Sequence, residues 1–482
     1  MLKYFYLTTT LPYVNAKPHI GHAVEFVRAD VLARFKSQEG YDVYFNTGAD
    51  EHGQKIYESA MEKNITPQDY VDQNTANLKI MLEKLNILDT IHFIRTTDSK
   101  HIATAQAFWK KVFDNGYIYK KKYKSKYCVG CELEKTDSEL VNNKCQDHPN
   151  KEIQIINEEN YFFKFSAFQT RLLNLYESRL DFVVPEIRQN EIASFVKSGL
   201  KDFSISRLQS KLPWGVPVPN DSAHTMYVWF DALTSYISTL DWPENSEKFE
   251  IYWKNGTPTQ YCGQDNLRQQ SAMWQAMLMA ADLPNSYQII INGFVTGEGG
   301  VKMSKTVGNV IDPTLLQEYY GTDAVRYYLL RHIHPWDGSP ITYDSFYKMY
   351  NGNLVNGLGN LTSRLMTLSE KYIDTIHLED TLADDDFANY MNSFRYDLAC
   401  DYIWEIISQI DKEISNTEPF RLIKTEPEKA KDLIRDYVQK LYTIGKLLLP
   451  IMPETANNII LAVRENKKPK IALFERKEKF SI

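Results

Sequence analysis

The sequence lacks most of the features that would place a protein in a membrane, outside the cell or in a fibre. None of its apolar runs reaches the roughly 18 residues that a membrane-spanning helix needs. Its first residues are typical of a strand and lack the apolar core of a secretion signal. Cysteine is scarce, with 5 in 482 residues, which is an odd number and too few for a disulfide scaffold. We therefore expect a cytoplasmic protein with no membrane partner.

The residues that are present are those of a folded protein with several domains. Hydrophobic residues make up 43% of the chain and charged residues 24%, which are usual values for a globular protein. A length of 482 residues predicts three or four structural units. The net charge of −7 argues against a protein that coats nucleic acid in general, although a local basic patch can still bind RNA.

Two short motifs, His19-Ile20-Gly21-His22 and Lys302-Met303-Ser304-Lys305, carry most of the functional information. The first opens a predicted helix over residues 19–38, after a predicted strand over 3–9. Such a turn presents unpaired N–H groups and the positive end of the helix dipole to phosphate. The second motif lies in a glycine-rich loop after a later predicted strand. Imidazole and ammonium groups can stabilise departing pyrophosphate, so the two motifs together predict ATP chemistry, although either alone could be structural.

The first part of the chain is predicted to form a βαβ unit. A second strand over residues 42–47 follows the helix and ends shortly before Asp50. Two strands joined in this way are parallel, and the ligands of such sheets bind beyond the carboxyl ends of the strands. His19, His22 and Asp50 all fall at those ends. We therefore expect the active site there.

The two motifs resemble the signatures of the class I aminoacyl-tRNA synthetases, and residues 11–22, 50–56 and 227–233 resemble those of the methionyl-tRNA synthetases. The resemblance covers essentially the whole chain. It implies a methionine pocket formed by Leu11, Tyr13, Asp50, Trp229, Ala232 and Tyr236. It also implies ATP binding, together with Mg²⁺, by Asn15, His19, Gly21, His22, Asp265, Lys302, Ser304 and Lys305. Among these, His19, His22, Lys302 and Lys305 are the expected catalytic residues.

The chemistry of the implied methionine pocket is consistent with its residues. Asp50 can pair with the substrate ammonium group, and Tyr13 and Trp229 can enclose a thioether, which makes favourable contacts with aromatic rings. Tyr236 can place a hydroxyl group near the sulfur atom. One segment departs from the family, because Gln269-Gln270 stand where many members have an aromatic residue and a histidine. The back wall of the pocket could therefore be more polar or differently packed.

The region from 116 to 223 contains a metal-binding pattern. Cys128 and Cys131 form one pair, and Cys145 and His148 form a second, each with two intervening residues. Four such ligands predict a tetrahedral zinc site, and a closed set of four protein ligands predicts a structural role. The alternative is a group of reduced cysteines without metal. The family resemblance agrees with zinc, since methionyl-tRNA synthetases carry such a knuckle in their connective peptide.

The last 130 or so residues are predicted to form a helix bundle. An apolar stripe is formed by Leu354, Leu358, Leu361 and Leu365. Asn356, Asn360 and Arg364 lie on the opposite face, and by helical periodicity alone this row would simply face solvent. The resemblance implies instead that the row reads a CAU anticodon, since such side chains can bond to the edges of splayed bases. Phe420 stands where the family usually has a tryptophan for base stacking.

The sequence thus predicts an α/β fold: a Rossmann-type parallel-sheet catalytic domain split by a zinc-knuckle insertion and followed by an all-α anticodon-binding bundle. The expected catalytic halves are residues 1–115 and 224–297, with the insertion at 116–223. Residues 298–349 are expected to hold the KMSK loop and a stem-contact fold, and residues 350–482 the bundle.

The activity that the resemblance implies is that of a methionine–tRNA ligase acting on ATP, L-methionine and tRNA(Met). One alternative is another class I amino-acid-activating ligase, such as a cysteine-activating enzyme, which would place zinc ligands in the pocket itself. A second is a non-catalytic tRNA-binding paralogue, against which the intact motifs argue. No additional C-terminal domain of the kind used for dimerisation is evident before residue 482, so we expect a monomer.

Overall fold

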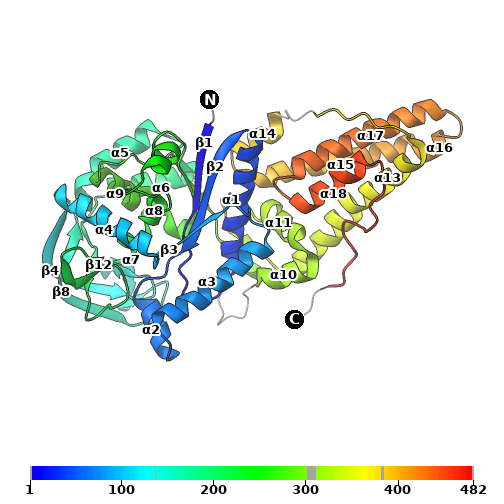
Figure 1. Cartoon of the computed structure of the whole chain (residues 1–482). Coiled ribbons are helices and arrows are strands. Elements are labelled where there is room, and N and C mark those ends of the chain that lie inside the picture. Colours follow the sequence, from blue (N-terminus) through cyan, green and yellow to red (C-terminus); the bar gives the residue numbers. More distant parts are fainter. Residues whose placement is uncertain (1–2, 136, 301–310, 381–384, 480–482) are drawn as a thin grey trace. The chain divides into compact units, whose positions relative to one another are not determined.

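The structure is a computed structural model that describes residues 3–135, 137–300, 311–380 and 385–479 (Figure 1). The chain forms two compact units, and each is built from separate stretches of sequence. The first unit contains Met1–Pro18, Gly40–Ile80 and Thr90–Asn292, and the second contains His19–Glu39, Met81–Asp89 and Gly293–Ile482. Among the described residues, no helix is both long and apolar enough to cross a membrane.

A six-stranded parallel sheet forms the centre of the first unit, in the order β3-β2-β1-β14-β15-β9. The strands are β1 (Lys3–Thr9), β2 (Tyr41–Ala49), β3 (His92–Arg95), β9 (Val183–Val184), β14 (Thr259–Gly263) and β15 (Gln288–Asn292). The predicted parallel α/β sheet is confirmed. The strand order reverses between β1 and β14, and ligands of such sheets bind beyond the carboxyl ends of the strands at this point.

Aromatic packing fills the core of the first unit. Its helices are α2 (Gln54–Glu62), α3 (Pro67–Lys84, with its last turn in the second unit), α4 (Ser99–Asp114), α5 (Gln169–Ser178), α6 (Glu186–Lys197), α7 (Val228–Ala232), α8 (Ser235–Ser238) and α9 (Trp274–Ala280). The Phe108 ring on α4 lies 5.8 Å from the rings of Phe230 and Trp274, measured between ring centroids. These contacts join α4, α7 and α9 in one hydrophobic cluster.

The approach to α9 is less regular than the sequence predicts. The periodicity favours one helix from Leu267 to Ala281, but a 3₁₀ turn (Gln264–Asn266) and a π-helical segment (Gln269–Met273) precede α9. The side chain of Gln275 donates to the backbone carbonyl of Gln270 at 2.9 Å. A side chain that bonds to a helix carbonyl in this way competes with the regular backbone pattern, and π-helical turns often occur at functional sites.

Antiparallel strands dominate the predicted insertion. β4 (Ile118–Cys128) and β8 (Ile153–Phe163) form a long pair, flanked by β5 (Leu133–Lys135) and β10 (Phe203–Ser204). Two smaller sheets contain β6 (Leu140–Val141) with β7 (Lys144–Cys145), and β11 (Ser206–Leu208) with β13 (Asp221–Met226) and β12 (Pro217–Val218). The same stretch of sequence also supplies β9 to the parallel sheet.

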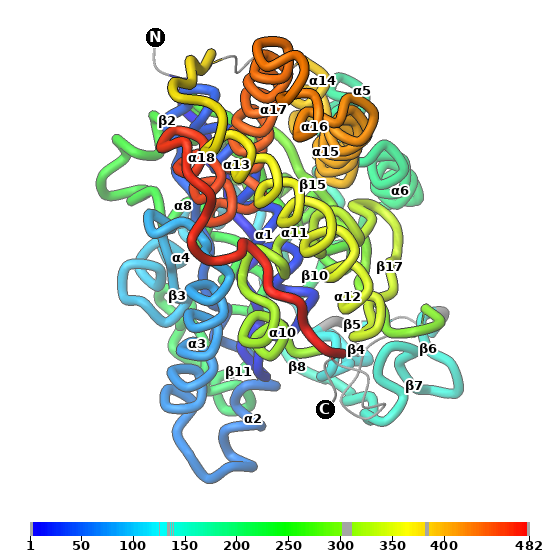
Figure 2. The backbone as a smooth tube through the Cα atoms, turned by 90° about the vertical axis from the view of Figure 1, so that its right-hand side faces the viewer, coloured from blue at the N-terminus to red at the C-terminus, as the bar shows by residue number. Residues whose placement is uncertain are grey.

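The second unit is mostly helical, apart from β16 (Val295–Thr296) and β17 (Ser339–Pro340). Its helices are α1 (Ile20–Gln38), α10 (Pro313–Tyr320), α11 (Thr322–Arg331), α12 (Tyr343–Met349), α13 (Asn360–Tyr372), α14 (Asp385–Asn392), α15 (Tyr396–Thr417), α16 (Pro419–Leu422), α17 (Pro427–Leu448) and α18 (Pro453–Arg464). Helices α13, α15, α17 and α18 lie side by side as a bundle (Figure 2). The predicted all-α bundle is therefore confirmed.

The predicted leucine stripe lies in the core of the bundle. Leu354, Leu358, Leu361 and Leu365 are all fully buried. The helix that carries them begins as a π-helical segment (Tyr350–Gly359) and becomes α-helical only from Asn360.

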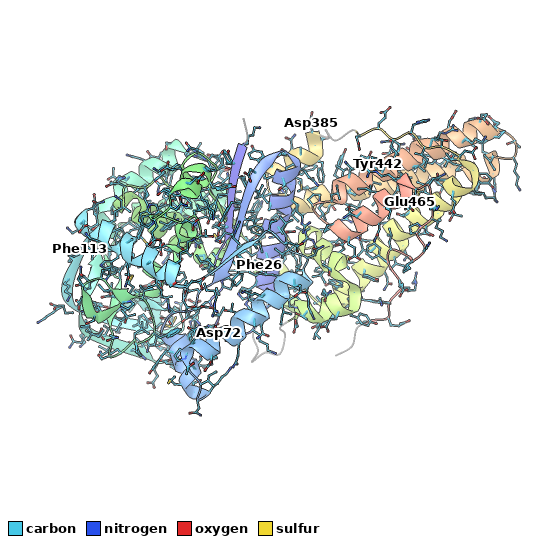
Figure 3. The ribbon with its side chains drawn as sticks, viewed as in Figure 1. Phe26, Asp72, Phe113, Asp385, Tyr442 and Glu465 are labelled. Atoms are coloured by element: carbon cyan, nitrogen blue, oxygen red, sulfur yellow. The ribbon has the colours of Figure 1, made fainter. Side chains whose placement is uncertain are left out.

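Of the residues labelled in Figure 3, Phe26 and Tyr442 are buried, whereas Asp72 and Glu465 are exposed.

A buried ion pair joins the helices of the second unit. The Arg326 guanidinium on α11 lies 2.7 Å from the Asp30 carboxylate on α1, and neither side chain is exposed. Arg326 also donates to the carbonyl oxygens of Ile451 at 3.0 Å and Leu85 at 3.1 Å. The second oxygen of Asp30 accepts from the backbone N–H of Leu88 at 2.8 Å. Both charges are thus satisfied by hydrogen bonds, as burial requires.

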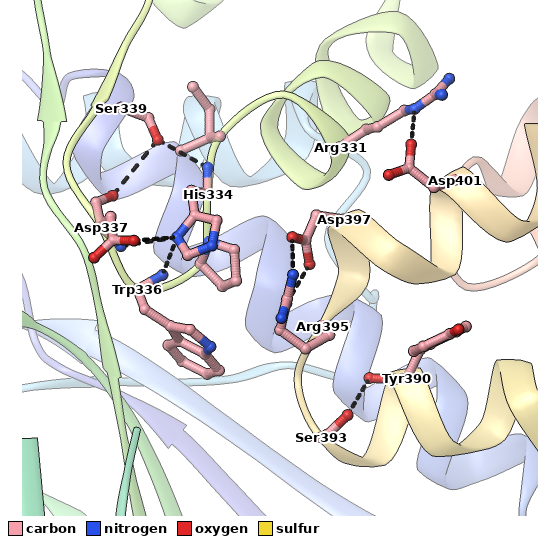
Figure 4. A network of polar contacts seen from close by, with 12 residues as sticks. Arg331, His334, Trp336, Asp337, Ser339, Tyr390, Ser393, Arg395, Asp397 and Asp401 are labelled. Atoms are coloured by element: carbon pink, nitrogen blue, oxygen red, sulfur yellow. Dashed lines mark hydrogen bonds and ion pairs between the residues drawn. The ribbon is translucent and has the colours of Figure 1, made fainter. Parts of the chain in front are cut away.

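Further polar contacts join α11 to α15 and shape the segment that follows α11 (Figure 4). Arg331 at the end of α11 bonds to Asp401 on α15 at 2.7 Å. After α11, the Ser339 hydroxyl accepts from the backbone N–H of His334 at 2.8 Å. Arg395 donates two hydrogen bonds, of 2.9 and 2.7 Å, to the carboxylate of Asp397 at the start of α15.

Removal of the Arg326 side chain should destabilise the protein strongly. Arg326→Ala would leave the buried Asp30 carboxylate with Arg34 as its remaining charge partner and would remove the bonds to the carbonyls of Ile451 and Leu85. The free energy of unfolding should therefore fall by about 3 kcal/mol. Arg435→Ala breaks a pair with Asp432 at the surface and should have little effect, since exposed pairs contribute little. Urea unfolding followed by circular dichroism measures both variants. Equal losses in the two would contradict this description of the core.

Candidate functional site

Two histidines cap the start of α1. The ring Nδ1 of His19 accepts from the backbone N–H of Gly21 at 3.1 Å, and the ring Nδ1 of His22 accepts from the backbone N–H of His19 at 3.2 Å. The two rings stack with centroids 4.0 Å apart. A Cβ atom on Gly21 would come within 2.9 Å of the His19 ring, so only glycine allows the ring to fold back over the helix.

These hydrogen bonds fix the protonation of His22. Because its Nδ1 atom accepts a hydrogen bond, a neutral His22 carries its hydrogen on Nε2 and can donate from there. The pKa of His22 is lowered from its ordinary value of 6.5 to about 3, first by burial and then by His19. The positive end of the helix dipole also disfavours a charged ring. His22 is therefore a neutral hydrogen-bond donor.

The expected methionine-binding residues gather in the first unit. A parallel bridge joins Tyr13 to Asp50, with the backbone N–H of Asp50 donating to the Pro12 carbonyl at 3.0 Å and that of Val14 donating to the Asp50 carbonyl at 3.1 Å. Asp50 is 6% exposed, and its Oδ1 atom is buried without a hydrogen-bond partner among the described residues. The pKa of Asp50 is raised well above its ordinary range, first by burial and then by Asp231. A cation that reached Asp50 would satisfy its buried oxygen.

Asp231, the acidic neighbour of Asp50, differs from it in having a hydrogen-bond partner for each of its two oxygens. Its two oxygens lie 2.6 Å from His52 Nδ1 and 2.7 Å from His101 Nε2. Burial alone would raise the pKa of Asp231, but the two histidines lower it to about 2. Asp231 is therefore a fixed negative charge that keeps the Asp50 pKa high, and the sequence analysis did not single it out.

Aromatic and apolar side chains lie around Asp50. Tyr13 and Trp229 pack against the same small cluster, which includes Tyr127 and Tyr227. Leu11 and Trp229 also pack against the large core that contains Tyr236, and Ala232 is buried close to Trp229 on α7. Of the expected pocket residues, Leu11, Tyr13, Trp229 and Tyr236 thus belong to or pack against two hydrophobic clusters that share Trp229.

Gln270, at the position where the sequence departs from the family, belongs to a buried network of polar side chains that includes Tyr236. Its Oε1 atom accepts from Gln260 Nε2 at 3.0 Å, which fixes the orientation of the amide. Its Nε2 atom then donates to the Tyr236 hydroxyl at 2.6 Å. Gln260 in turn accepts from the Ser286 hydroxyl at 2.8 Å. Gln270 thus orients the hydroxyl group of Tyr236.

Four ligand atoms capable of binding one metal ion converge at the end of β4. Those of Cys128, Cys131, Cys145 and His148 all lie within 4.8 Å of one another. Cys131 Sγ lies 3.4 Å from Cys145 Sγ and 3.2 Å from His148 Nδ1. Ligands of tetrahedral zinc are separated by about 3.5–3.8 Å, given bond lengths of about 2.0–2.3 Å, so the group fits this ion.

The expected ATP-binding residues are only partly described. Lys302, Ser304 and Lys305 lie outside the described residues. Asp265 is exposed on the turn that follows β14, at the carboxyl end of the sheet. The Asn15 carbonyl accepts from the Tyr70 hydroxyl at 2.7 Å, which fixes the loop before α1. The described part of the chain therefore includes Asn15 and Asp265 but neither of the two lysines.

The expected anticodon-binding residues form an exposed row in the second unit. Asn356, Asn360 and Arg364 all face solvent, as the sequence predicts. Arg364 lies 3.3 Å from Asp411, and Asn356 accepts from Arg476 at 2.8 Å. Phe420 on α16 is 41% exposed, so part of its ring is accessible.

The protonation of His22 can be tested directly. With [¹⁵N]histidine labelling and His22→Gln to assign the signal, the His22 ring should show the Nε2–H form and should not titrate between pH 5 and 8. Because the folded pKa is lowered to about 3, the stability that a neutral His22 contributes is complete above pH 6.5 and is lost as the pH falls towards 3. A midpoint near the ordinary value would contradict this assignment.

The comparisons with known proteins agree with this geometry. The family model for tRNA synthetases class I (M) matches residues 5–148 and 131–366. The chain is 40% identical over 472 residues to the methionine–tRNA ligase of Caldanaerobacter subterraneus subsp. tengcongensis, covering 94% of this chain and 73% of that protein. It is 37% identical over 486 residues to the methionine–tRNA ligase of Brucella suis biovar 1, covering 96% and 93% respectively.

Solved structures show the same similarity. Mycobacterium tuberculosis methionyl-tRNA synthetase in complex with methionyl-adenylate matches with a TM-score of 0.89 and 33% identity, covering 98% of this chain and 100% of that one. The apo form of that enzyme matches with a TM-score of 0.82 and 30% identity, covering 99% of both chains. The chain therefore belongs to the methionine–tRNA ligase family of class I tRNA synthetases.

Proposed function

We propose that this chain is a methionine–tRNA ligase. Methionine and ATP would form methionyl-adenylate with release of pyrophosphate, and the methionyl group would then pass to the 3′-terminal adenosine of tRNA(Met), with release of AMP. The observation that carries the proposal is the pocket around Asp50, where a buried carboxylate oxygen without a partner among the described residues lies beside aromatic side chains.

The pocket suits methionine in charge and in shape. Asp50 would pair with the α-ammonium group, which would compensate the cost of its burial. Tyr13 and Trp229 would enclose the thioether, with Leu11 and Ala232 completing the apolar lining. Tyr236, whose oxygen accepts from Gln270, would place its hydroxyl group near the methionine sulfur.

The reaction needs no covalent enzyme intermediate. His19, His22, Lys302 and Lys305 would stabilise the charge that develops as pyrophosphate leaves, and Asn15, Gly21, Asp265 and Ser304 would help to bind ATP. Mg²⁺ would accompany the triphosphate. The capped start of α1 supports this role, because backbone N–H groups occupy both ring Nδ1 atoms, and the neutral His22 ring can donate from Nε2.

We also propose that zinc binds Cys128, Cys131, Cys145 and His148 as a structural ion. The convergence of these four ligands supports the proposal. The five-part domain division, a cytoplasmic location and a monomeric state remain predictions from the sequence. The anticodon role of Asn356, Asn360, Arg364 and Phe420 is supported by their exposure on one unit.

The proposed activity is tested by amino-acid-dependent exchange between ATP and pyrophosphate. Among the twenty amino acids, methionine alone should support rapid exchange by the purified chain. Asp50→Asn should abolish most of this exchange, because it removes the charge that pairs with the ammonium group, whereas Asp72→Asn at the surface should not. Exchange that depends on a different amino acid, or no exchange at all, would show that the proposed function is wrong.

Zinc binding gives an independent prediction. Protein purified without chelator should contain one zinc ion per chain by metal analysis. Cys128→Ser should lower the metal content and the thermal stability, because the energy of structural metal binding is also folding energy. Cys400→Ser, which alters a buried cysteine outside the cluster, should keep the zinc. Zinc-free wild-type protein would contradict the assignment.

The anticodon residues should affect charging without affecting activation. Asn360→Ala and Arg364→Ala should reduce aminoacylation of tRNA(Met), with a cost on the order of 1–3 kcal/mol for each lost base contact. Methionine-dependent ATP–pyrophosphate exchange should be unchanged, since it needs no tRNA. Lys371→Ala on the same helix is the control. Equal charging of tRNAs with CAU and non-CAU anticodons by the wild type would contradict this assignment.

A further inference from the structure

We propose that Glu132 is a positioning residue for the methionine pocket and that it couples this pocket to the metal-binding knuckle. Glu132 would act through Tyr13, which it holds in place. This inference rests on the proposed function, because it gives Tyr13 a role in binding methionine.

The contacts of Glu132 converge on Tyr13. Its Oε1 atom accepts from the Tyr13 hydroxyl at 3.1 Å and from the backbone N–H of Lys55 at 3.0 Å. Its Oε2 atom accepts from the Tyr127 hydroxyl. The three donors come from the loop before α1, from α2 and from β4. Glu132 therefore joins three parts of the first unit that are distant in sequence.

Burial and backbone geometry show that this arrangement is specific. Glu132 is only 6% exposed, although glutamate is rarely buried without partners. Its φ angle of 51° lies in the left-handed region, which costs energy for a residue with a side chain. A Cβ atom on Gly53 would come within 2.6 Å of the Tyr13 hydroxyl, so glycine at this position leaves room for the Tyr13–Glu132 bond.

The donor in the Tyr13–Glu132 bond is the tyrosine hydroxyl group. The pKa of Tyr13 is raised well above its ordinary value, first by burial and then by Glu132. The phenol therefore keeps its hydrogen at neutral pH and can donate it. Because donors already occupy both oxygens of Glu132, its effect on methionine is exerted through the position of the Tyr13 ring.

The knuckle lies directly beside Glu132 in the chain. Cys131, one of the four metal-binding residues, precedes it, and Tyr127 precedes Cys128. A Cβ atom on Gly130 would come within 2.4 Å of the His148 ring, so the chain is closely packed between the ligands. A metal ion that fixes Cys128 and Cys131 would thus also fix the backbone on both sides of the Glu132–Tyr127 contact. Through Glu132 and Tyr13, the knuckle would then stabilise one wall of the methionine pocket.

The test compares methionine binding in five proteins: wild type, Glu132→Ala, Glu132→Gln, Tyr13→Phe and the Glu132→Ala/Tyr13→Phe double variant. Glu152→Ala, which removes an exposed glutamate from the same insertion, is the matched control. The methionine Kd is measured by calorimetry, the KM for methionine and for ATP by exchange kinetics, and the zinc content by metal analysis. Thermal unfolding shows whether each variant folds.

Glu132→Ala and Tyr13→Phe should each weaken methionine binding about tenfold, the effect of losing one hydrogen bond to a charged group. The KM for ATP should change less than about twofold. The double variant should be no weaker than Glu132→Ala alone, since Glu132→Ala already removes the bond that Tyr13→Phe removes. Glu132→Gln keeps an acceptor oxygen and should remain within about threefold of the wild type. Removal of zinc with a chelator should weaken methionine binding in the wild type more than in Glu132→Ala.

The inference would be overturned if Glu132→Ala folded, kept its zinc and bound methionine normally. It would also be overturned if the effects of the two single variants multiplied, or if Glu132→Gln bound as weakly as Glu132→Ala, since charge and not position would then be responsible. If Glu132→Ala does not fold, Tyr13→Phe combined with Glu132→Gln replaces it, and multiplied effects again contradict the proposal. A wild type that does not activate methionine would instead refute the proposed function.

Discussion

The ion pair between Asp30 and Arg326 is the constraint on which the arrangement of the second unit depends. It lies in the interior, where an unpaired charge would be costly, so α1 and α11 are held in one register. Arg326 extends this connection to the carbonyl of Ile451, between α17 and α18. The helix that carries His19 and His22 is thereby fixed to the helices of the bundle. The start of α1 and the helices of the bundle are therefore joined through buried polar contacts within the second unit.

The buried carboxylates of the first unit differ in their hydrogen bonding, and the difference supports the proposed position of the substrate ammonium group. Two histidines satisfy Asp231, and three donors satisfy Glu132. Asp50 alone among these three has a buried oxygen without a partner in the described part of the chain. A site that binds an ammonium group needs such an oxygen, together with neighbours that cannot themselves neutralise it. The cost of leaving Asp50 unpaired is thus consistent with its proposed use.

Much of the fold and of the candidate site could be predicted from the sequence at positions where local pattern and chemistry agree. The strands at 3–9 and 42–47, the buried leucine stripe and the four converging metal ligands are confirmed. The π-helical segments at 269–273 and 350–359 could not be predicted, because α-helical periodicity takes no account of side chains that compete for backbone groups. Glu132 and Asp231 were missed because all of their partners except Tyr127 are distant in sequence. A glutamate directly after a metal ligand was the only local signal for Glu132.

The central claim is that one chain both activates methionine and selects its tRNA. The most direct measurement incubates the purified chain with ATP, methionine and an unfractionated tRNA pool, protects the charged 3′ ends from periodate oxidation, and sequences the protected tRNAs. The account predicts that the protected tRNAs carry CAU anticodons and that their attached amino acid is methionine by mass spectrometry. Charged tRNAs with unrelated anticodons, or a different attached amino acid, would contradict it.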